Sequence, residues 1–431
     1  MPKATTLLVL LIANSLTAAL VLAGAPEAGR DPDAASLPAL TLADARAKAL
    51  AASPELQALA AQLRAADGAA RQAGAFANPD LVLEVEDFGG SGSLDVASQN
   101  TYSVAQSIEW FGKRSARVDA ARLEYEVAAR DLDRGRRDLL ADVDRKFATL
   151  LGSQERAAIA EQNAQTAREV TQAVSNLVAA GEVSPIEEAR AEGDQALASI
   201  ELANAIRDAD LARRGLARLW GEDVPSFATA AGTLATVVEL PERDAALAAL
   251  NSLPDLTRWD AEAARQAALV TLAERQSLPD LSLSVGARTY SGQDGYAYVA
   301  GLALPIPLFT QYAGARAEAA ARQEQAAHGR RADEVRIRVE FLSAYDTLAR
   351  AIDEARALRE EVLPRALKVY EALNEGYRRG KFPLLDLLEA RRTLAQTRLH
   401  YVDALVRLNI ADADLRRLVP DDTEDTIGAQ P

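Results

Sequence analysis

The sequence lacks cysteine and has little histidine, methionine or aromatic residue. With no Cys in 431 residues, disulfides, thiolate metal sites, cysteine nucleophiles and an N-terminal Cys lipid anchor are all excluded. The only Met is the initiator, and the two His, His328 and His400, are far apart, so no bound metal or other cofactor is expected. We find no set of nucleophile, base and orienting group, and therefore do not expect an enzyme.

Basic residues are fewer than acidic ones: the sequence has 48 Lys and Arg against 63 Asp and Glu, for a formal net charge of -15. Without a basic stripe, nucleic-acid binding is not expected. The only long apolar run lies in residues 1–25, where Lys3 precedes it and Ala23 and Ala25 form an A-x-A site. This pattern predicts a cleaved secretory signal peptide over 1–25, with a retained membrane anchor as the alternative.

Segments of the remaining chain recur at an offset of about 200 residues. "NPDL" at 78–81 answers to "LPDL" at 278–281, and the turn "GEVS" at 181–184 answers to "GKFP" at 380–383. Such self-similarity indicates a tandem duplication. We expect a first repeat over 26–220, a connector over 221–241, a second repeat over 242–418 and a flexible tail over 419–431.

Ala, Leu, Arg and Glu dominate the chain and favour long helices. Each repeat has one long helical run, about 113–180 and 315–379, with apolar residues at coiled-coil spacing. About 65 helical residues span on the order of 100 Å. The runs end in helical hairpin turns at about 181–185 and 380–383. In the first turn Gly181 can end a helix, and Ser184 with Glu187 can form a capping box.

In four segments apolar residues alternate with polar or small ones instead of following the helical spacing. These segments are at about 79–88, 101–110, 280–290 and 296–308. In the third, one face carries the apolar side chains of Leu281, Leu283, Val285 and Ala287. About ten residues is the length of a tilted membrane-spanning strand. A small soluble sheet covering a helix is the alternative. Because four strands cannot close a barrel with an open lumen, the membrane interpretation requires several chains to build one wall.

These features resemble the TolC family of outer-membrane efflux proteins over essentially the whole mature chain. The resemblance is carried by the "NPDL" and "LPDL" strand openings, "PIPLF" at 305–309, and the turns "GEVSPIEEAR" at 181–190 and "GKFPLLDLLEARRTL" at 380–394. "QSIEWFGKRSAR" at 106–117 is similar to the signature of the CzcC-type subgroup, the outer-membrane partners of heavy-metal cation exporters. Within it we expect Lys113 and Arg114 at the inner membrane–water boundary.

The resemblance implies a mixed fold of coiled-coil helices and membrane strands, closed by a homotrimer into a 12-stranded β-barrel and a periplasmic α-helical barrel. It implies an outer-membrane location in a Gram-negative bacterium, and a periplasmic adaptor and an inner-membrane RND transporter as partners. The implied function is passive conduction of substrate, with divalent heavy-metal cations favoured by the subgroup. A multidrug or type I secretion channel is the alternative of the same class. A soluble periplasmic coiled-coil adaptor is the rival of another class, disfavoured by two complete hairpins.

The resemblance also implies site residues at the hairpin ends. Asp386 and Glu389 match the acids of the pore constriction, lie three apart on one helix face and would form carboxylate rings that attract cations; complementing the helix dipole is their alternative role. Tyr377 and Glu187 match a latch of the closed end, although for Glu187 the capping-box role is the favoured single explanation. Phe382 replaces a basic residue of some family members. The expected adaptor contacts are Gly181, Glu182, Val183, Ser184, Gly380, Lys381, Phe382 and Pro383.

Overall fold

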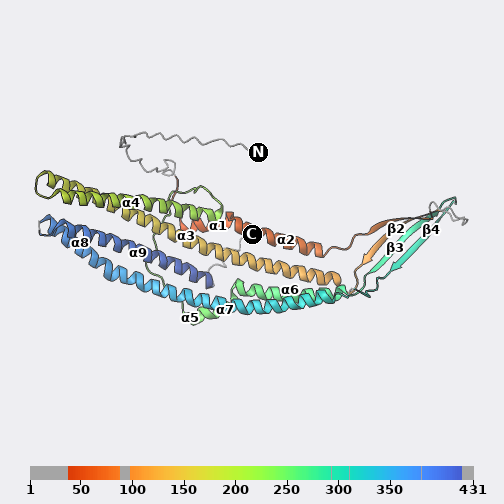
Figure 1. Ribbon diagram of the computed structural model, residues 1–431. Coiled ribbons are helices and arrows are strands. Elements are labelled where there is room, and N and C mark those ends of the chain that lie inside the picture. Colours follow the sequence, from red (N-terminus) through yellow and green to blue (C-terminus); the bar gives the residue numbers. More distant parts are fainter. Residues whose placement is uncertain (1–36, 88–97, 293, 310, 380, 420–431) are drawn as a thin grey trace, which may run out of the picture.

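The computed structural model describes residues 37–87, 98–292, 294–309, 311–379 and 381–419. The predicted signal peptide, the turn residue Gly380 and residues 420–431 of the predicted tail lie outside these ranges. The described chain is elongated, with a small sheet at one end, two helical hairpin turns at the other, and long helices running between them (Figure 1).

The helices of the first half are α1 (Leu42–Ala52), α2 (Pro54–Ala73), α3 (Lys113–Ala179) and α4 (Pro185–Ala217), followed by the short 3₁₀ helix η2 (Arg218–Trp220). Those of the second half are α5 (Arg243–Ala249), the 3₁₀ helix η3 (Leu250–Ser252), α6 (Pro254–Gln276), α7 (Ala313–Ala357), α8 (Leu363–Arg378) and α9 (Leu384–Leu418). The 67 residues of α3 span about 100 Å, as expected from the sequence.

The long helical run of the second half is interrupted, which differs from our expectation of one run over 315–379. A π-helical segment, η4 (Leu358–Val362), separates α7 from α8. Pro364, in the first turn of α8, explains the interruption. A proline has no backbone N–H to donate, and its ring clashes with the carbonyl four residues before it, so the regular α-helical pattern cannot continue through it.

The sheet contains β1 (Asp80–Glu86), β2 (Gln99–Ile108), β3 (Leu281–Tyr290) and β4 (Tyr296–Ala303), antiparallel and in the order β1-β2-β3-β4. The four antiparallel strands confirm that part of the predicted fold. β4 ends at Ala303, before the expected 308, since Pro305 and Pro307 cannot donate ladder hydrogen bonds.

The register places most of the large apolar side chains of the four strands on one face. Leu83 lies opposite Tyr102, Tyr102 opposite Ala287, and Ala287 opposite Tyr298. This face is open in the single chain, where 83% of Leu81 and 84% of Tyr298 are exposed. The other face carries polar residues, among them Glu84, Thr101, Ser103 and Arg288. An uncovered apolar face of this kind marks a surface that contacts another protein or a membrane.

The main hydrophobic core lies midway along the rods, where α1 and the connector wrap around α3, α7 and α9. Its fully buried members include Leu150, Leu216, Phe227, Phe341 and Leu408. The connector is fixed to the segment before α1 by a parallel bridge between Leu40 and Ala230. This shared core joins the two halves of the chain.

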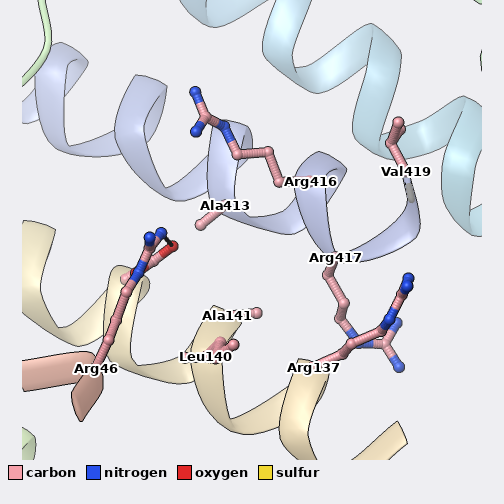
Figure 2. Close-up of a pocket in the computed structure, with 9 residues that line it drawn as sticks. Arg46, Arg137, Leu140, Ala141, Ala413, Arg416, Arg417 and Val419 are labelled. Carbon is pink, nitrogen blue, oxygen red and sulfur yellow. Dashed lines mark hydrogen bonds and ion pairs between the residues drawn. The ribbon is translucent and has the colours of Figure 1, made fainter. Parts of the chain in front are cut away.

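A small cavity of about 70 Å³ beside this core is lined by the arginines Arg46, Arg137, Arg416 and Arg417 (Figure 2). Their charges are largely matched. Nε of Arg46 donates to Asp144 Oδ1 at 2.8 Å, Arg416 pairs with Asp412 at 2.9 Å, and Arg417 pairs with Asp138 and with Glu340. The cavity is therefore part of the structural junction between α1, α3, α7 and α9.

No helix in the described ranges combines the length and the hydrophobicity that a bilayer crossing requires.

Candidate functional site

The turns between α3 and α4 and between α8 and α9 lie together at the end of the molecule opposite the sheet (Figure 1). The first turn is built as the sequence predicts. Gly181 adopts a φ of 75°, and the N–H of Glu182 donates to the carbonyl of Leu177 at 2.9 Å. This is the Schellman arrangement, which needs a residue without Cβ strain in the left-handed conformation.

The start of α4 agrees with the predicted capping box only in part. Ser184 is the N-cap, and its hydroxyl accepts from the N–H of Ile186 at 3.3 Å. The carboxylate of Glu187 accepts instead from Arg190 at 3.0 Å. Glu187 is therefore engaged along its own helix, and its acidic charge complements the positive helix N-terminus.

The second turn is closed by an aromatic ring. The N–H of Lys381 donates to the carbonyl of Gly376 at 2.8 Å. The ring of Phe382 lies on Gly376, so that a Cβ at this glycine would come within 2.2 Å of Phe382 Cδ2. Pro383 precedes α9 and offers no capping side chain. Phe382 thus has a packing role where some family members have a cation.

An apolar cluster joins the two hairpins just above the turns. Val174 of α3, Ala191 of α4, and Leu384 and Leu387 of α9 form its buried centre. Tyr377 of α8 packs against it, half-buried. Burial raises the pKa of the Tyr377 phenol, and the negative charge of Glu187 raises it further. Of the two predicted latch residues, Tyr377 thus packs at the cluster that joins the hairpins, and Glu187 acts on it through its charge.

Asp386 and Glu389 lie on a different face of α9 from the cluster. Asp386 is half-buried and Glu389 is exposed, while the neighbouring Leu384, Leu387 and Ala390 are buried. Neither carboxylate forms an ion pair with another side chain in the described part of the chain. Their carboxylates are thus available to interact with a group outside the described part of the chain.

Sequence reasoning missed a buried ion pair two turns beyond Glu187. Asp194 of α4 pairs with Arg391 of α9, and also with Arg392 at 3.3 Å. The side chain of Arg391 is 9% exposed, and its Nε and Nη1 atoms are buried without a hydrogen-bond partner among the described residues. Burial lowers the pKa of Arg391, and the neighbouring charge of Arg392 lowers it further. A groove of about 500 Å³ between α3, α4 and α9 adjoins this pair.

The segment 106–117 has a structural explanation at the other end of α3. Phe111 and Gly112 have φ of 60° and 72°, which turns β2 into the helix. Arg117 binds the carboxylate of Glu109 with two nitrogens. Arg114 and Arg117 also donate to carbonyls at the C-terminus of α2, where cations complement the helix dipole.

Lys113 lies at the junction of the sheet and the rods, and its place at a membrane–water boundary stays a prediction. It is 7% exposed, and its Nζ pairs with Asp280 at 2.9 Å. The lysine therefore joins the start of α3 to the start of β3. The described residues include no group of three His, Asp or Glu side chains placed to hold a metal ion.

Comparison with known proteins adds family information to this geometry. The sequence model of the outer membrane efflux protein family matches residues 45–222 and 247–419. The chain is 34% identical over 380 residues to the cobalt-zinc-cadmium resistance protein CzcC of Cupriavidus metallidurans, covering 88% of this chain and 90% of that protein. It is 29% identical over 352 residues to the nickel-cobalt-cadmium resistance protein NccC of Alcaligenes xylosoxydans xylosoxydans, covering 80% and 79%.

Among solved structures, the crystal structure of CusC superimposes with a TM-score of 0.74 at 17% identity, covering 88% of this chain and 92% of CusC. At this identity the likeness concerns the fold alone. Together with the family match, it confirms the resemblance that the sequence motifs indicated.

Proposed function

The chain belongs to the outer membrane efflux protein family, and we propose that three copies form a duct that passively conducts divalent heavy-metal cations out of the cell. Each copy would contribute four strands to a 12-stranded barrel in the outer membrane. The rods would extend the bore into the periplasm. There the hairpin ends would meet a periplasmic adaptor and an inner-membrane RND transporter.

One observation carries the proposal: a sheet with two free edges and an exposed apolar face stands at the end of rods about 100 Å long. Unpaired strand edges and uncovered apolar side chains are both unfavourable in water. Joining β4 of one copy to β1 of the next pairs every edge, and lipid covers the apolar face. Four strands of one chain are too few to leave an open bore.

The choice of cargo is supported by the relatives and by charge. CzcC is a cobalt-zinc-cadmium resistance protein and covers nearly the whole chain. In a trimer Asp386 and Glu389 would supply six carboxylates at the narrow end of the bore, which attract cations and repel anions. Tyr377 and Glu187 are the proposed latch there: Tyr377 packs against the cluster that joins the hairpins, and the charge of Glu187 raises the pKa of its phenol.

Deletion of the gene from its host tests the cargo. We expect the deletion strain to lose tolerance of zinc, cobalt or cadmium salts, and a plasmid copy of the gene to restore it. Tolerance of dyes and antibiotics serves as the control and should not change. Unaltered metal tolerance together with lost dye tolerance would instead support a multidrug channel.

A further inference from the structure

The ion pair between Lys113 and Asp280 connects the two repeats within one chain. Lys113 begins α3 of the first repeat, and Asp280 immediately precedes β3 of the second. The lysine is buried at the seam where β2 and β3 are adjacent. This contact fixes the sheet to the rods where one repeat meets the other.

The second repeat carries the same surface without its partner. In the first repeat a stripe of α3 formed by Lys113, Ala116 and Ala120 is buried. Two hundred residues later the corresponding stripe of α7 is exposed, and it consists of Ala313, Arg316 and Ala320. Within one chain the second repeat supplies the partner of Lys113. By the same duplication, the first repeat of another copy should cover this stripe of α7.

The first repeat has the complementary gap. Asp80, the counterpart of Asp280, is exposed at the start of the edge strand β1 and forms no ion pair with another described side chain. α6 packs against both α3 and α7, whereas its counterpart α2 packs mainly against α3. One side of the first repeat is thus open where the second repeat is covered.

Charge identifies the residue that would complete the contact. Ala313 stands where the first repeat has Lys113, so the equivalent cation is missing. Arg316 is the one basic residue in the first turn of α7, lies on the uncovered stripe, and forms no ion pair with another described side chain. Its longer side chain starts one helical turn further along the rod.

Within one chain Asp80 and Arg316 cannot meet. Asp80 begins β1 and Arg316 is in the first turn of α7, which follows β4, and β1 and β4 form opposite edges of the sheet. Three strand spacings place these edges about 14 Å apart. We propose that Arg316 of one copy pairs with Asp80 of the next, at the junction of barrel and rods, so that each such site is completed by a second copy. This inference rests on the proposed trimer and adds the residues that join its neighbours.

Cross-linking tests the proximity in a chain that contains no native Cys. The doubly substituted protein Asp80→Cys/Arg316→Cys, in outer-membrane vesicles, is treated with a short bismaleimide and run on denaturing gels. We expect covalent dimers and trimers. Asp80→Cys alone and Arg316→Cys alone should stay monomeric, and Lys113→Cys/Asp280→Cys should keep the monomer mass because its cross-link is within one chain.

The failures of the two proposals differ in this experiment. Noncovalent trimers in unheated samples with only monomers after cross-linking would overturn the Asp80–Arg316 contact and leave the duct intact. Absence of any trimer would overturn the duct itself.

Charge reversal tests the pairing beyond proximity. Asp80→Arg alone and Arg316→Asp alone should lower the temperature at which trimers dissociate, and both together should restore it. If neither single variant changes that temperature, the residues are neighbours that do not form an ion pair.

Discussion

The proposed role of Asp386 and Glu389 is to give the duct its cation preference. Replacing both by their amides, Asp386→Asn with Glu389→Gln, removes six carboxylates from a trimer while nearly preserving side-chain volume. We expect the ratio of cation to anion permeability in planar bilayers to fall several-fold, because fixed charge at a constriction selects ions by sign.

Glu371→Gln is the matched control, since it removes an exposed carboxylate from another helix, α8, near the same end. It should leave the permeability ratio unchanged. If the double amide variant behaves like this control, the two acids only complement the N-terminus of α9.

The pair between Asp194 and Arg391 should decide how firmly the hairpins hold together. Asp194→Asn leaves a buried guanidinium without its counter-charge, which costs about 3–5 kcal/mol. Arg391→Met removes the buried charge itself and should cost far less, while Asp194 keeps Arg392 as a partner. Protease sensitivity of the hairpin ends and the melting temperature measure both. Equal effects of the two variants would contradict a role for the unpaired charge.

The residues of the site differ in how far the sequence could predict them. The closeness of Tyr377 and Glu187 follows from motif resemblance. The pairs Asp194–Arg391 and Lys113–Asp280 join residues well over 150 positions apart. The first contact depends on the rotation of α4 about its axis relative to α9, and the second on where the sheet meets the rods. Apolar spacing specifies both too coarsely to choose a partner.

At the scale of elements, α3 and α9 approach closely because α3 carries a glycine at the contact. A Cβ at Gly152 would come within 2.1 Å of Val406 Cγ2 of α9. Gly152→Ala should therefore force the helices apart and destabilise the rod by about 1–3 kcal/mol.

Gly193→Ala on α4 is the control, since nothing lies within 4 Å of its added Cβ. There alanine should stabilise the helix by about 0.5–1 kcal/mol. Loss of helical circular dichroism on heating should thus shift in opposite directions for the two variants. A downward shift for both would contradict the packing argument.

Elements with one strong period were predictable, and interruptions were not. α3 has sustained coiled-coil spacing, and the structure contains it as one helix of 67 residues. In the second half the same spacing continues through Pro364, and periodicity concealed the π-helical segment that the proline imposes. Pro305 and Pro307 shortened β4 in the same way. Backbone hydrogen bonding decided these boundaries, whereas the apolar pattern suggested continuity.

The whole molecule is incomplete as a single chain. Both edges of its sheet are free, and α4 exposes a row of apolar side chains that includes Ile186, Leu197, Ile200 and Leu211. Alternation in the sequence predicted the apolar face of the sheet, whereas the apolar row of α4 was found only in the structure. What covers them could come only from resemblance to a family, because one chain does not contain its neighbours.

The two faces of the sheet should respond oppositely to the same charge if they face lipid and lumen. Val104 and Ser103 are adjacent on strand β2 and point to the apolar and the polar face, respectively.

Val104→Arg places a cation against the hydrocarbon near mid-strand, at a cost of about 2–4 kcal/mol per copy. If three copies share one barrel as proposed, that cost is incurred three times, and we expect no heat-modifiable trimers in the outer-membrane fraction. Ser103→Arg points a cation into a wide aqueous lumen opposite Gly286, which has no side chain to obstruct it, and trimers should form at wild-type levels. Equal tolerance of both substitutions would mean that neither face contacts lipid, and the sheet would then be a soluble cover rather than part of a barrel wall.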